Sequence, residues 1–179
     1  MGSNDPFVRA AAPPSAGAQA LFERNLREHR RVFDRLESLA GPIHAAAQAM
    51  TEALRRGGRL LFCGNGGSAS DSQHLAAEFV GRLGRERAPL AAMALPADGV
   101  TMSALANDYG YDAVFARQVQ AQGRAGDCLV VLSTSGRSPN VLRALEAARA
   151  GGLASVALLG RDGGPARALA DIAIVVEHE

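Results

Sequence analysis

The sequence contains no lysine, because all 19 of its basic residues are arginine in a chain of 179 residues. This absence excludes every mechanism that needs a lysine amine, such as Schiff-base aldolases and pyridoxal-phosphate enzymes. It also excludes the nucleotide-binding loop that ends in Gly-Lys-Ser or Gly-Lys-Thr. We therefore expect neither a pyridoxal nor a nucleotide cofactor.

Tryptophan is also absent, cysteine occurs twice, and the 19 basic and 18 acidic residues leave a net charge of +1. No run of five or six basic residues occurs, so we expect no nucleic-acid partner. No segment approaches the ~18 apolar residues of a membrane span, and the N-terminus lacks the pattern of a signal peptide. Cys63 and Cys128 border apolar runs, which predicts free, buried thiols in a reducing compartment. We expect a cytoplasmic protein with no membrane contact.

Two helices are predicted to precede the first strand. Residues 1–18 are rich in Ala, Pro, Gly and Ser and predict a flexible leader, so a single domain is expected over residues 19–179. From Gln19 to Leu39 apolar residues recur at three- and four-residue steps, which predicts an amphipathic helix whose apolar stripe also carries His29. Ala40, Gly41 and Pro42 are expected to interrupt it. A second helix is predicted from Pro42 to Arg56, with a glycine pair past its end.

The rest of the chain alternates short apolar runs with helical stretches. Five strands are predicted over residues 59–63, 91–95, 128–132, 155–159 and 171–176. Helices are predicted over residues 68–83, 99–106, 112–122, 139–150 and 164–170. Strands that alternate with helices imply right-handed crossovers and a parallel sheet, so we expect an α/β fold with three layers and a central five-stranded sheet.

A glycine-rich turn, Gly64-Asn65-Gly66-Gly67-Ser68, follows the first predicted strand. Such a turn lets the backbone approach a ligand closely, and the free amides at the start of the next helix favour an anion. The alternative is a tight turn with Ser68 or Ser70 as the N-cap of the helix.

A second turn of this kind, residues 133–140, follows the third predicted strand. It carries four hydroxyl side chains around a glycine, and hydroxyls can donate hydrogen bonds to phosphate oxygens. Helix capping would need only one or two of them. Because ligands of open α/β sheets bind beyond the carboxyl ends of the strands, the two turns together predict a phosphorylated ligand. The four hydroxyl residues are Ser133, Thr134, Ser135 and Ser138.

Two further pairs of residues are candidates for chemistry. His74 and Glu78 lie four residues apart, on one face of the predicted helix, and can bind a metal or manage a proton. The alternative is an ordinary surface contact. Asn107 and Asp108 precede Tyr109-Gly110, where they either orient sugar hydroxyls or simply form a turn.

With these blocks the sequence resembles the sugar isomerase (SIS) domain and, within it, the sedoheptulose-7-phosphate isomerases. The resemblance runs from about residue 20 to 176. It rests on GNGGS (64–68), the segment from Gln73 to Glu78, AxxNDYGY (104–111), FxRQV (115–119), GD (126–127), STSGRSPN (133–140) and GRDGG (160–164). It implies the SIS fold, an α/β sandwich of flavodoxin-like or Rossmann-like type.

The resemblance also implies roles for individual residues. It implies substrate contacts from Asn65, Gly66, Gly67, Asn107 and Asp108. Phosphate contacts are implied for Ser68, Ser133, Thr134, Ser135 and Ser138. His74 and Glu78 are implied to bind a metal, with zinc as the ion to expect if one binds, and Glu78 to carry the proton as general base.

The family converts sedoheptulose 7-phosphate to D-glycero-D-manno-heptose 7-phosphate through an enediol, for the heptoses of lipopolysaccharide or other surface glycans. The resemblance therefore implies an aldose-ketose isomerase with a phosphorylated sugar substrate, assembled as a homo-oligomer, in this family a tetramer. Family members continue into a further helix that carries a Gln and a His. This sequence ends at Glu179, so we expect the domain to lack that helix.

Two alternatives to this function remain. Some SIS relatives are not enzymes but bind the replication initiator DnaA, and these lack the carboxylate at the position of Glu78. Other SIS domains act on hexose or pentose phosphates. The presence of Glu78 favours an enzyme, and the GNGGS and NDYGY blocks favour a heptose phosphate.

Overall fold

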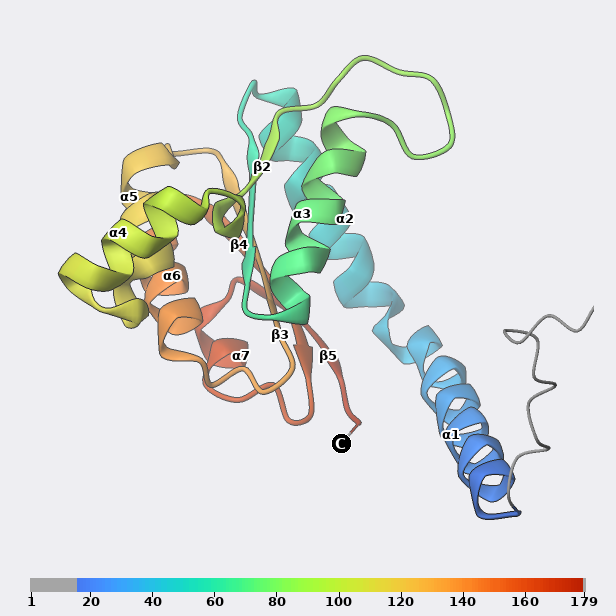
Figure 1. Ribbon diagram of the computed structural model, residues 1–179. Coiled ribbons are helices and arrows are strands. Elements are labelled where there is room, and N and C mark those ends of the chain that lie inside the picture. Colours follow the sequence, from blue (N-terminus) through green and yellow to red (C-terminus); the bar gives the residue numbers. More distant parts are fainter. Residues whose placement is uncertain (1–15, 179) are drawn as a thin grey trace, which may run out of the picture. The chain divides into compact units, whose positions relative to one another are not determined.

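The computed structural model describes residues 16–178 (Figure 1). The chain divides into two compact units, Met1–Arg35 and Leu36–Glu179. In the first unit, helix α1 (Ala16–Asp34) begins three residues before its predicted start at Gln19. The remainder of the predicted leader, residues 1–15, lies outside the described residues. No helix in the described part of the chain is long and apolar enough to cross a membrane.

The second unit begins with a 3-10 turn, η1 (Leu36–Leu39), and helix α2 (Ala40–Arg55). The break between the two helices therefore lies at residues 35–39 rather than at the predicted Ala40–Pro42. α1 ends at Asp34 instead of Leu39, and Gly41 and Pro42 lie in the first turn of α2. Proline is tolerated there, since a first-turn amide has no carbonyl partner within its own helix. α2 ends at Arg55, one residue before its predicted end at Arg56, and Gly57 then has a φ of +81°, a conformation that glycine adopts without strain.

Five strands form one parallel sheet in the order β2-β1-β3-β4-β5. This confirms the predicted α/β fold with a five-stranded parallel sheet. The strands are β1 (Leu60–Gly64), β2 (Ala92–Ala94), β3 (Cys128–Ser133), β4 (Ala154–Gly160) and β5 (Ile172–Val176). β1 and β3 are buried along their whole length, whereas β2 and β5, at the two edges of the sheet, are only partly buried.

The helices lie close to their predicted positions but differ at several ends. They are α3 (Gly67–Val80), α4 (Gly99–Tyr109), α5 (Val114–Gln122), α6 (Pro139–Ala150) and α7 (Ala166–Leu169), with short 3-10 turns η2 (Leu95–Ala97) and η3 (Tyr111–Ala113). α3 ends at Val80 rather than Leu83, and Arg87 donates hydrogen bonds to the last-turn carbonyls of Glu78 and Phe79. α4 runs to Tyr109 rather than Ala106, and α7 is only one turn long. α5 begins at Val114 rather than Asp112, because residues 111–113 form a 3-10 turn.

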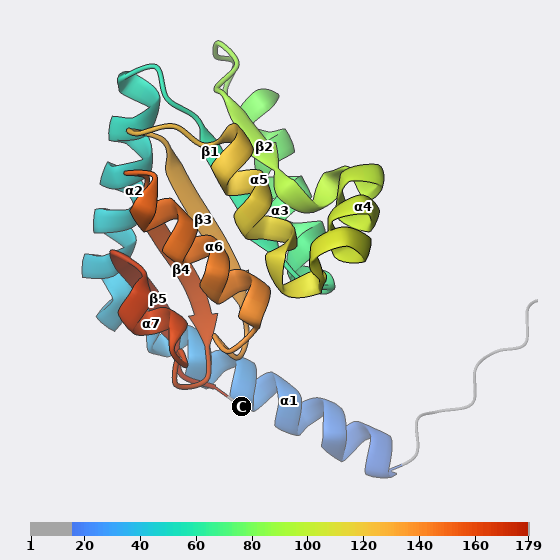
Figure 2. The same cartoon turned by 90° about the vertical axis from the view of Figure 1, so that its left-hand side faces the viewer.

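Helices cover both faces of the sheet (Figure 2), and alternate side chains of the central strands enter two separate cores. Leu60 and Phe62 pack with residues of α2 and α3 on one face of the sheet. Leu61 and Cys63 pack with residues of α5, α6 and α7 on the other. Because successive strand residues point to opposite faces, one apolar run supplies both cores. The unit is thus a three-layer sandwich.

The strand order reverses direction at β1, since the chain passes first to β2 on one side and then to β3 on the other. At such a switch point the loops after the two neighbouring strands leave toward opposite faces, and a crevice opens between them. The loops in question are the two turns that the sequence predicts to bind phosphate. The topology therefore places both at one crevice.

Candidate functional site

Gly64 and Gly66 determine the conformation of the turn after β1. A Cβ at Gly64 would lie 2.6 Å from the Cβ of Ser68 and 2.8 Å from the carbonyl oxygen of Leu132, so only glycine lets α3 start this close to β3. Gly66 has a φ of +55° and is the N-cap of α3, with no capping bond from a side chain. Ser68 and Ser70 are therefore not N-caps, as the structural alternative for this turn had them, and the tight turn places Gly66 at the N-cap instead.

The turn after β3 uses its serines in two ways. The Ser133 hydroxyl accepts a hydrogen bond from the Gly136 amide at 3.1 Å, and the Ser135 hydroxyl accepts one from the Arg137 amide at 3.2 Å. A hydroxyl that accepts in this way still has its proton to donate. Ser138 is the N-cap of α6 but makes no side-chain capping bond. The loop thus holds hydroxyl donors in place without consuming them.

The two turns enclose a cavity of about 220 Å³ at the carboxyl ends of β1 and β3. Six of the residues predicted to bind substrate or phosphate line it, together with Leu132 and Arg161, and none of the lining residues is acidic. Hydroxyl donors around a cavity free of carboxylates suit a phosphate group. The six residues are Asn65, Ser68, Ser133, Thr134, Ser135 and Ser138.

Asn65 joins the two turns through a reciprocal pair of amides. Its Nδ2 donates to Oδ1 of Asn140 at 2.9 Å, and Nδ2 of Asn140 donates to Oδ1 of Asn65 at 2.9 Å. The Tyr111 hydroxyl also donates to Oδ1 of Asn65, at 3.0 Å. Asn140 is 2% exposed, at the start of α6. Sequence reasoning missed Asn140 and Tyr111, since their partner lies 75 and 46 residues away.

His74 and Glu78 lie on one face of α3, as predicted, with 3.2 Å between His74 Nε2 and Glu78 Oε1. The His74 side chain is 75% exposed and that of Glu78 is 32% exposed. Neither residue lines the cavity between the two turns, which we call the serine cavity. Glu78 lies ~15 Å along the helix from Ser68 at 1.5 Å per residue. No cluster of three or more His, Cys, Asp or Glu side chains able to hold a metal occurs among residues 16–178.

Asn107 and Asp108 lie in the last turn of α4, rather than in a turn that follows the helix. Asn107 Nδ2 donates to Asp108 Oδ1 at 2.9 Å, and both side chains are exposed. Neither lines the serine cavity, and the backbone glycines Gly66 and Gly67 do not line it either. The link between this segment and the cavity is Tyr111, which reaches Asn65.

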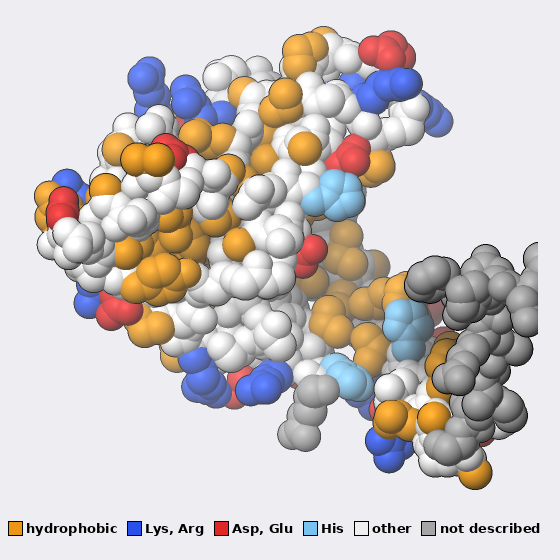
Figure 3. All heavy atoms as spheres, viewed as in Figure 1, with side chains coloured by type: hydrophobic (Ala, Val, Ile, Leu, Met, Phe, Trp, Pro, Cys, Tyr) orange, Lys and Arg blue, Asp and Glu red, His pale blue; other side chains and the backbone are white. Residues whose placement is uncertain are grey.

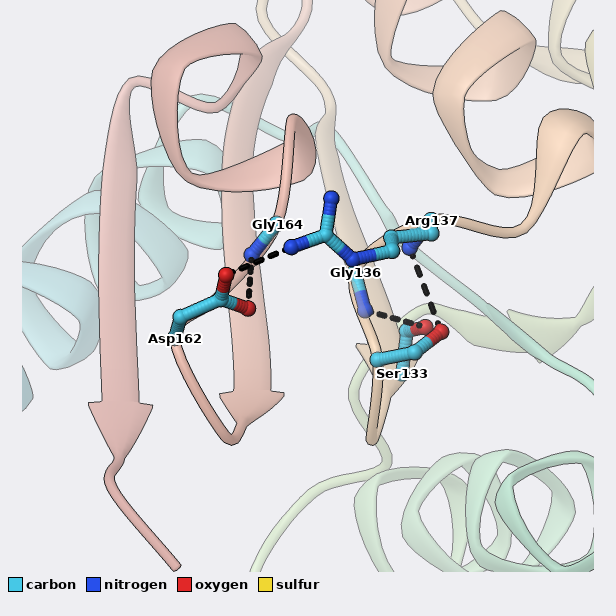
Figure 4. A network of polar contacts seen from close by, with 6 residues as sticks. Ser133, Gly136, Arg137, Asp162 and Gly164 are labelled. Carbon is cyan, nitrogen blue, oxygen red and sulfur yellow. Dashed lines mark hydrogen bonds and ion pairs between the residues drawn. The ribbon is translucent and has the colours of Figure 1, made fainter. Parts of the chain in front are cut away.

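The loop after β4 packs directly against the serine turn (Figure 4). A Cβ at Gly160 would lie 2.9 Å from the Thr134 carbonyl oxygen, and the Ala166 amide donates to the Gly136 carbonyl at 3.1 Å. Arg137 forms an ion pair with Asp162 across the two loops. A hydrogen bond from the Gly164 amide, followed by the charge of Arg137, lowers the pKa of the Asp162 carboxyl. The sequence patterns assign no role to Arg137 or Asp162, and so miss this contact.

A hydroxyl-lined cavity at the switch point of a parallel sheet is typical of α/β proteins that bind phosphorylated small molecules. The family model of the SIS domain matches residues 25–160. The chain is 54% identical over 144 residues to a phosphoheptose isomerase of Rhodospirillum rubrum, covering 80% of this chain and 77% of that protein. It is 48% identical over 156 residues to one of Nitratiruptor, covering 87% and 83%. The chain belongs to the SIS domain family and, within it, to the phosphoheptose isomerases.

Solved structures agree with this assignment. The phosphoheptose isomerase of Neisseria gonorrhoeae matches with a TM-score of 0.84 and 43% identity, covering 90% of this chain and 87% of that one. That of Francisella tularensis matches with a TM-score of 0.81 and 35% identity, covering 90% and 84%. The predicted family and fold are therefore confirmed.

Proposed function

We propose that this protein isomerises sedoheptulose 7-phosphate to D-glycero-D-manno-heptose 7-phosphate, as an aldose-ketose isomerase of heptose synthesis for lipopolysaccharide or another surface glycan. The observation that carries the proposal is the cavity of hydroxyl side chains between the ends of β1 and β3. Its donors suit a phosphate monoester, and the relatives that share this fold at 43% to 54% identity are phosphoheptose isomerases. The cavity alone would also suit an isomerase of another phosphosugar, and it is the 54% and 48% identity to phosphoheptose isomerases that favours the heptose phosphate over this alternative and over a DnaA-binding protein.

In this proposal the substrate is anchored by its phosphate, remote from the carbons that react. The hydroxyls of Ser68, Ser133, Thr134, Ser135 and Ser138 donate to the phosphate oxygens. Asn65, Gly66, Gly67, Asn107 and Asp108 contact the sugar. Binding energy from such a remote anchor positions the reacting carbons against the catalytic group.

Glu78 is the proposed general base. Its carboxylate removes a proton from C1 of the ketose while the C2 carbonyl oxygen gains a proton, which gives the enediol. The proton then returns at C2 as the C1 hydroxyl loses its own, so an aldose forms with no net change in atoms or electrons. His74, 3.2 Å from Glu78 Oε1, orients the carboxylate.

The side chains near Glu78 supply only part of a metal site. His74 and Glu78 offer one nitrogen and one oxygen ligand, and a catalytic zinc ion takes three protein ligands and an open position. Such an ion would stabilise the negative charge of the enediolate when bound. Since two ligands do not complete a site, no step above depends on it. Elemental analysis of the purified protein tests for the ion.

The proposed assembly is a homo-oligomer, a tetramer, in the cytoplasm. α1 has an amphipathic sequence and buries none of its residues, with Phe22 66% and Phe33 57% exposed. Apolar side chains also reach the surface over α4, where Val100 is 81% exposed (Figure 3). A second subunit can cover such residues and bring a second Glu78 near the cavity. Light scattering tests the assembly, and a monomer would contradict it.

The decisive experiment is Glu78→Gln, assayed with sedoheptulose 7-phosphate. Loss of the base should lower kcat by at least ~10²-fold, the usual contribution of a general base, and leave the affinity for the sugar phosphate nearly unchanged. Glu146→Gln, an exposed carboxylate on α6, is the matched control and should behave as the parent. An unchanged kcat in Glu78→Gln would remove Glu78 from the mechanism. Absence of turnover in the parent itself would contradict the proposed function.

A further inference from the structure

The proposed phosphate cavity has one charged side chain on its wall, that of Arg161. The other lining residues are five hydroxyl residues, Asn65 and Leu132. Hydroxyls donate hydrogen bonds but carry no charge, and a phosphate dianion that leaves water needs a nearby cation. In a chain without lysine, arginine or a protonated histidine can supply it, and no histidine lines this cavity. Arg161 is the arginine that the cavity offers.

The backbone of Arg161 has an unusual conformation. Its φ is +51°, and it is the only residue other than glycine with a positive φ in the described part of the chain. Such a conformation is unfavourable for a side chain with a Cβ, and it persists where the surrounding structure holds it in place. Here Gly160 packs on Thr134 and Gly136 packs on Gly163, so the loop has little freedom. In this conformation Arg161 lies on the wall of the cavity.

The ion pair between the loops after β3 and β4 leaves the Arg161 guanidinium available to bind a ligand. Asp162, the next residue, pairs with Arg137 of the serine turn, and Figure 4 shows the two side chains meeting between the loops. No hydrogen bond or ion pair of the Arg161 guanidinium occurs with any residue of 16–178. Arg137 does not line the serine cavity, although it shares with Arg161 a larger, adjoining hollow of about 920 Å³. Of these two neighbouring arginines, one is therefore neutralised and the other is not.

From these observations we propose that Arg161 binds the phosphate of the substrate and supplies the countercharge that the serine hydroxyls lack. The inference rests on the proposed function for the identity of the sugar phosphate. Arg161 acts on an anchor that is present in the substrate and in the transition state alike. Its loss should therefore weaken binding and leave the chemical step almost unchanged.

The test compares Arg161→Gln, Arg161→Lys and Arg161→Gly with the parent. Arg161→Gln should raise the KM for sedoheptulose 7-phosphate and the Kd for inorganic phosphate about tenfold or more, the usual value of a charged hydrogen bond, with kcat within about threefold. Arg161→Lys keeps the charge and should recover part of the affinity. Arg161→Gly relieves the positive φ, so its melting temperature should not fall, yet it should bind as weakly as Arg161→Gln.

Arg124→Gln is the matched control, because Arg124 is exposed and lies just before β3, at the amino ends of the strands, whereas the cavity lies at their carboxyl ends. It removes the same charge and should leave KM and Kd as in the parent. The inference is overturned if Arg161→Gln binds inorganic phosphate within about twofold of the parent, or if Arg124→Gln loses as much affinity. If the parent binds phosphate but turns over no sugar phosphate, the proposed function fails. The Kd values for inorganic phosphate, measured by calorimetry, still decide the role of Arg161.

Discussion

Replacing Gly136 by alanine tests whether the contact between the two loops at the cavity supports the fold. Gly136 has a φ of +60°, and a Cβ built on it would lie 1.9 Å from the carbonyl oxygen of Gly163 and 2.6 Å from its carbonyl carbon. The backbone strain alone costs about 1–2 kcal/mol. Overpacking against a backbone that cannot rotate away adds about 1–3 kcal/mol. The free energy of unfolding should therefore fall by roughly 2–5 kcal/mol, a large part of the usual 5–15 kcal/mol.

Gly57→Ala separates the two contributions. Gly57 has a φ of +81°, but a Cβ there would meet nothing within 4 Å, so the substitution costs only the strain. Urea unfolding of both variants should show that Gly136→Ala is the less stable by about 1–3 kcal/mol. If the two loops separate locally instead, the cost should appear as weaker phosphate binding. Equal stability of the two variants, together with unchanged phosphate binding, would refute the reasoning.

Two further predictions concern buried groups. Burial, and then the charges of Asp171 and Asp127, raise the pKa of the Cys128 thiol to about 12, and burial raises the pKa of the Cys63 thiol. Since the unfolded thiols titrate near ~8.5, the folded state holds their protons more tightly, and stability should fall as the pH rises through that value. Both thiols should react with iodoacetamide only on unfolding, and rapid labelling of the native protein would be contrary to this. The buried Asp127 carboxylate accepts hydrogen bonds from the backbone amides of Arg59 at 2.8 Å and Arg124 at 2.9 Å. Asp127→Asn should therefore lower the free energy of unfolding in urea by about 1–3 kcal/mol. Asp112→Asn, which removes an exposed pair with Arg143, should cost less than about 1 kcal/mol, and equal losses would contradict the argument.

The sheet was predictable from the sequence because its central strands β1 and β3 are buried on both faces. Leu60 to Cys63 feed two different cores, which requires an unbroken apolar run that is easily found. Helix ends were harder to predict, because they depend on single positions. Pro42 looked like a break but fits the first turn of α2, and α4 continues to Tyr109 because Gly110 supplies a φ of +81°.

The site was predictable in part. Ser133 and Ser135 lie close together in the sequence, so the hydroxyl-rich turn that lines the cavity could be predicted as part of a site. Asn140, Tyr111 and Arg161 could not be assigned roles, because each acts across loops that only the folded chain brings together. A local pattern carries no information on such contacts. The contacts that these three residues make at the cavity are therefore seen only in the folded structure.

The paired amides of Asn65 and Asn140 have a consequence for how the protein responds to its solution. Neither group gains or loses a proton near neutral pH, and a bond between neutral partners responds little to salt. The spacing of the two turns is therefore insulated from acidity and ionic strength. Binding through Arg161, by contrast, depends on charge and weakens as salt screens it. A dependence of activity on salt would thus report on the charge of the ligand, because the two turns joined by Asn65 and Asn140 keep their spacing.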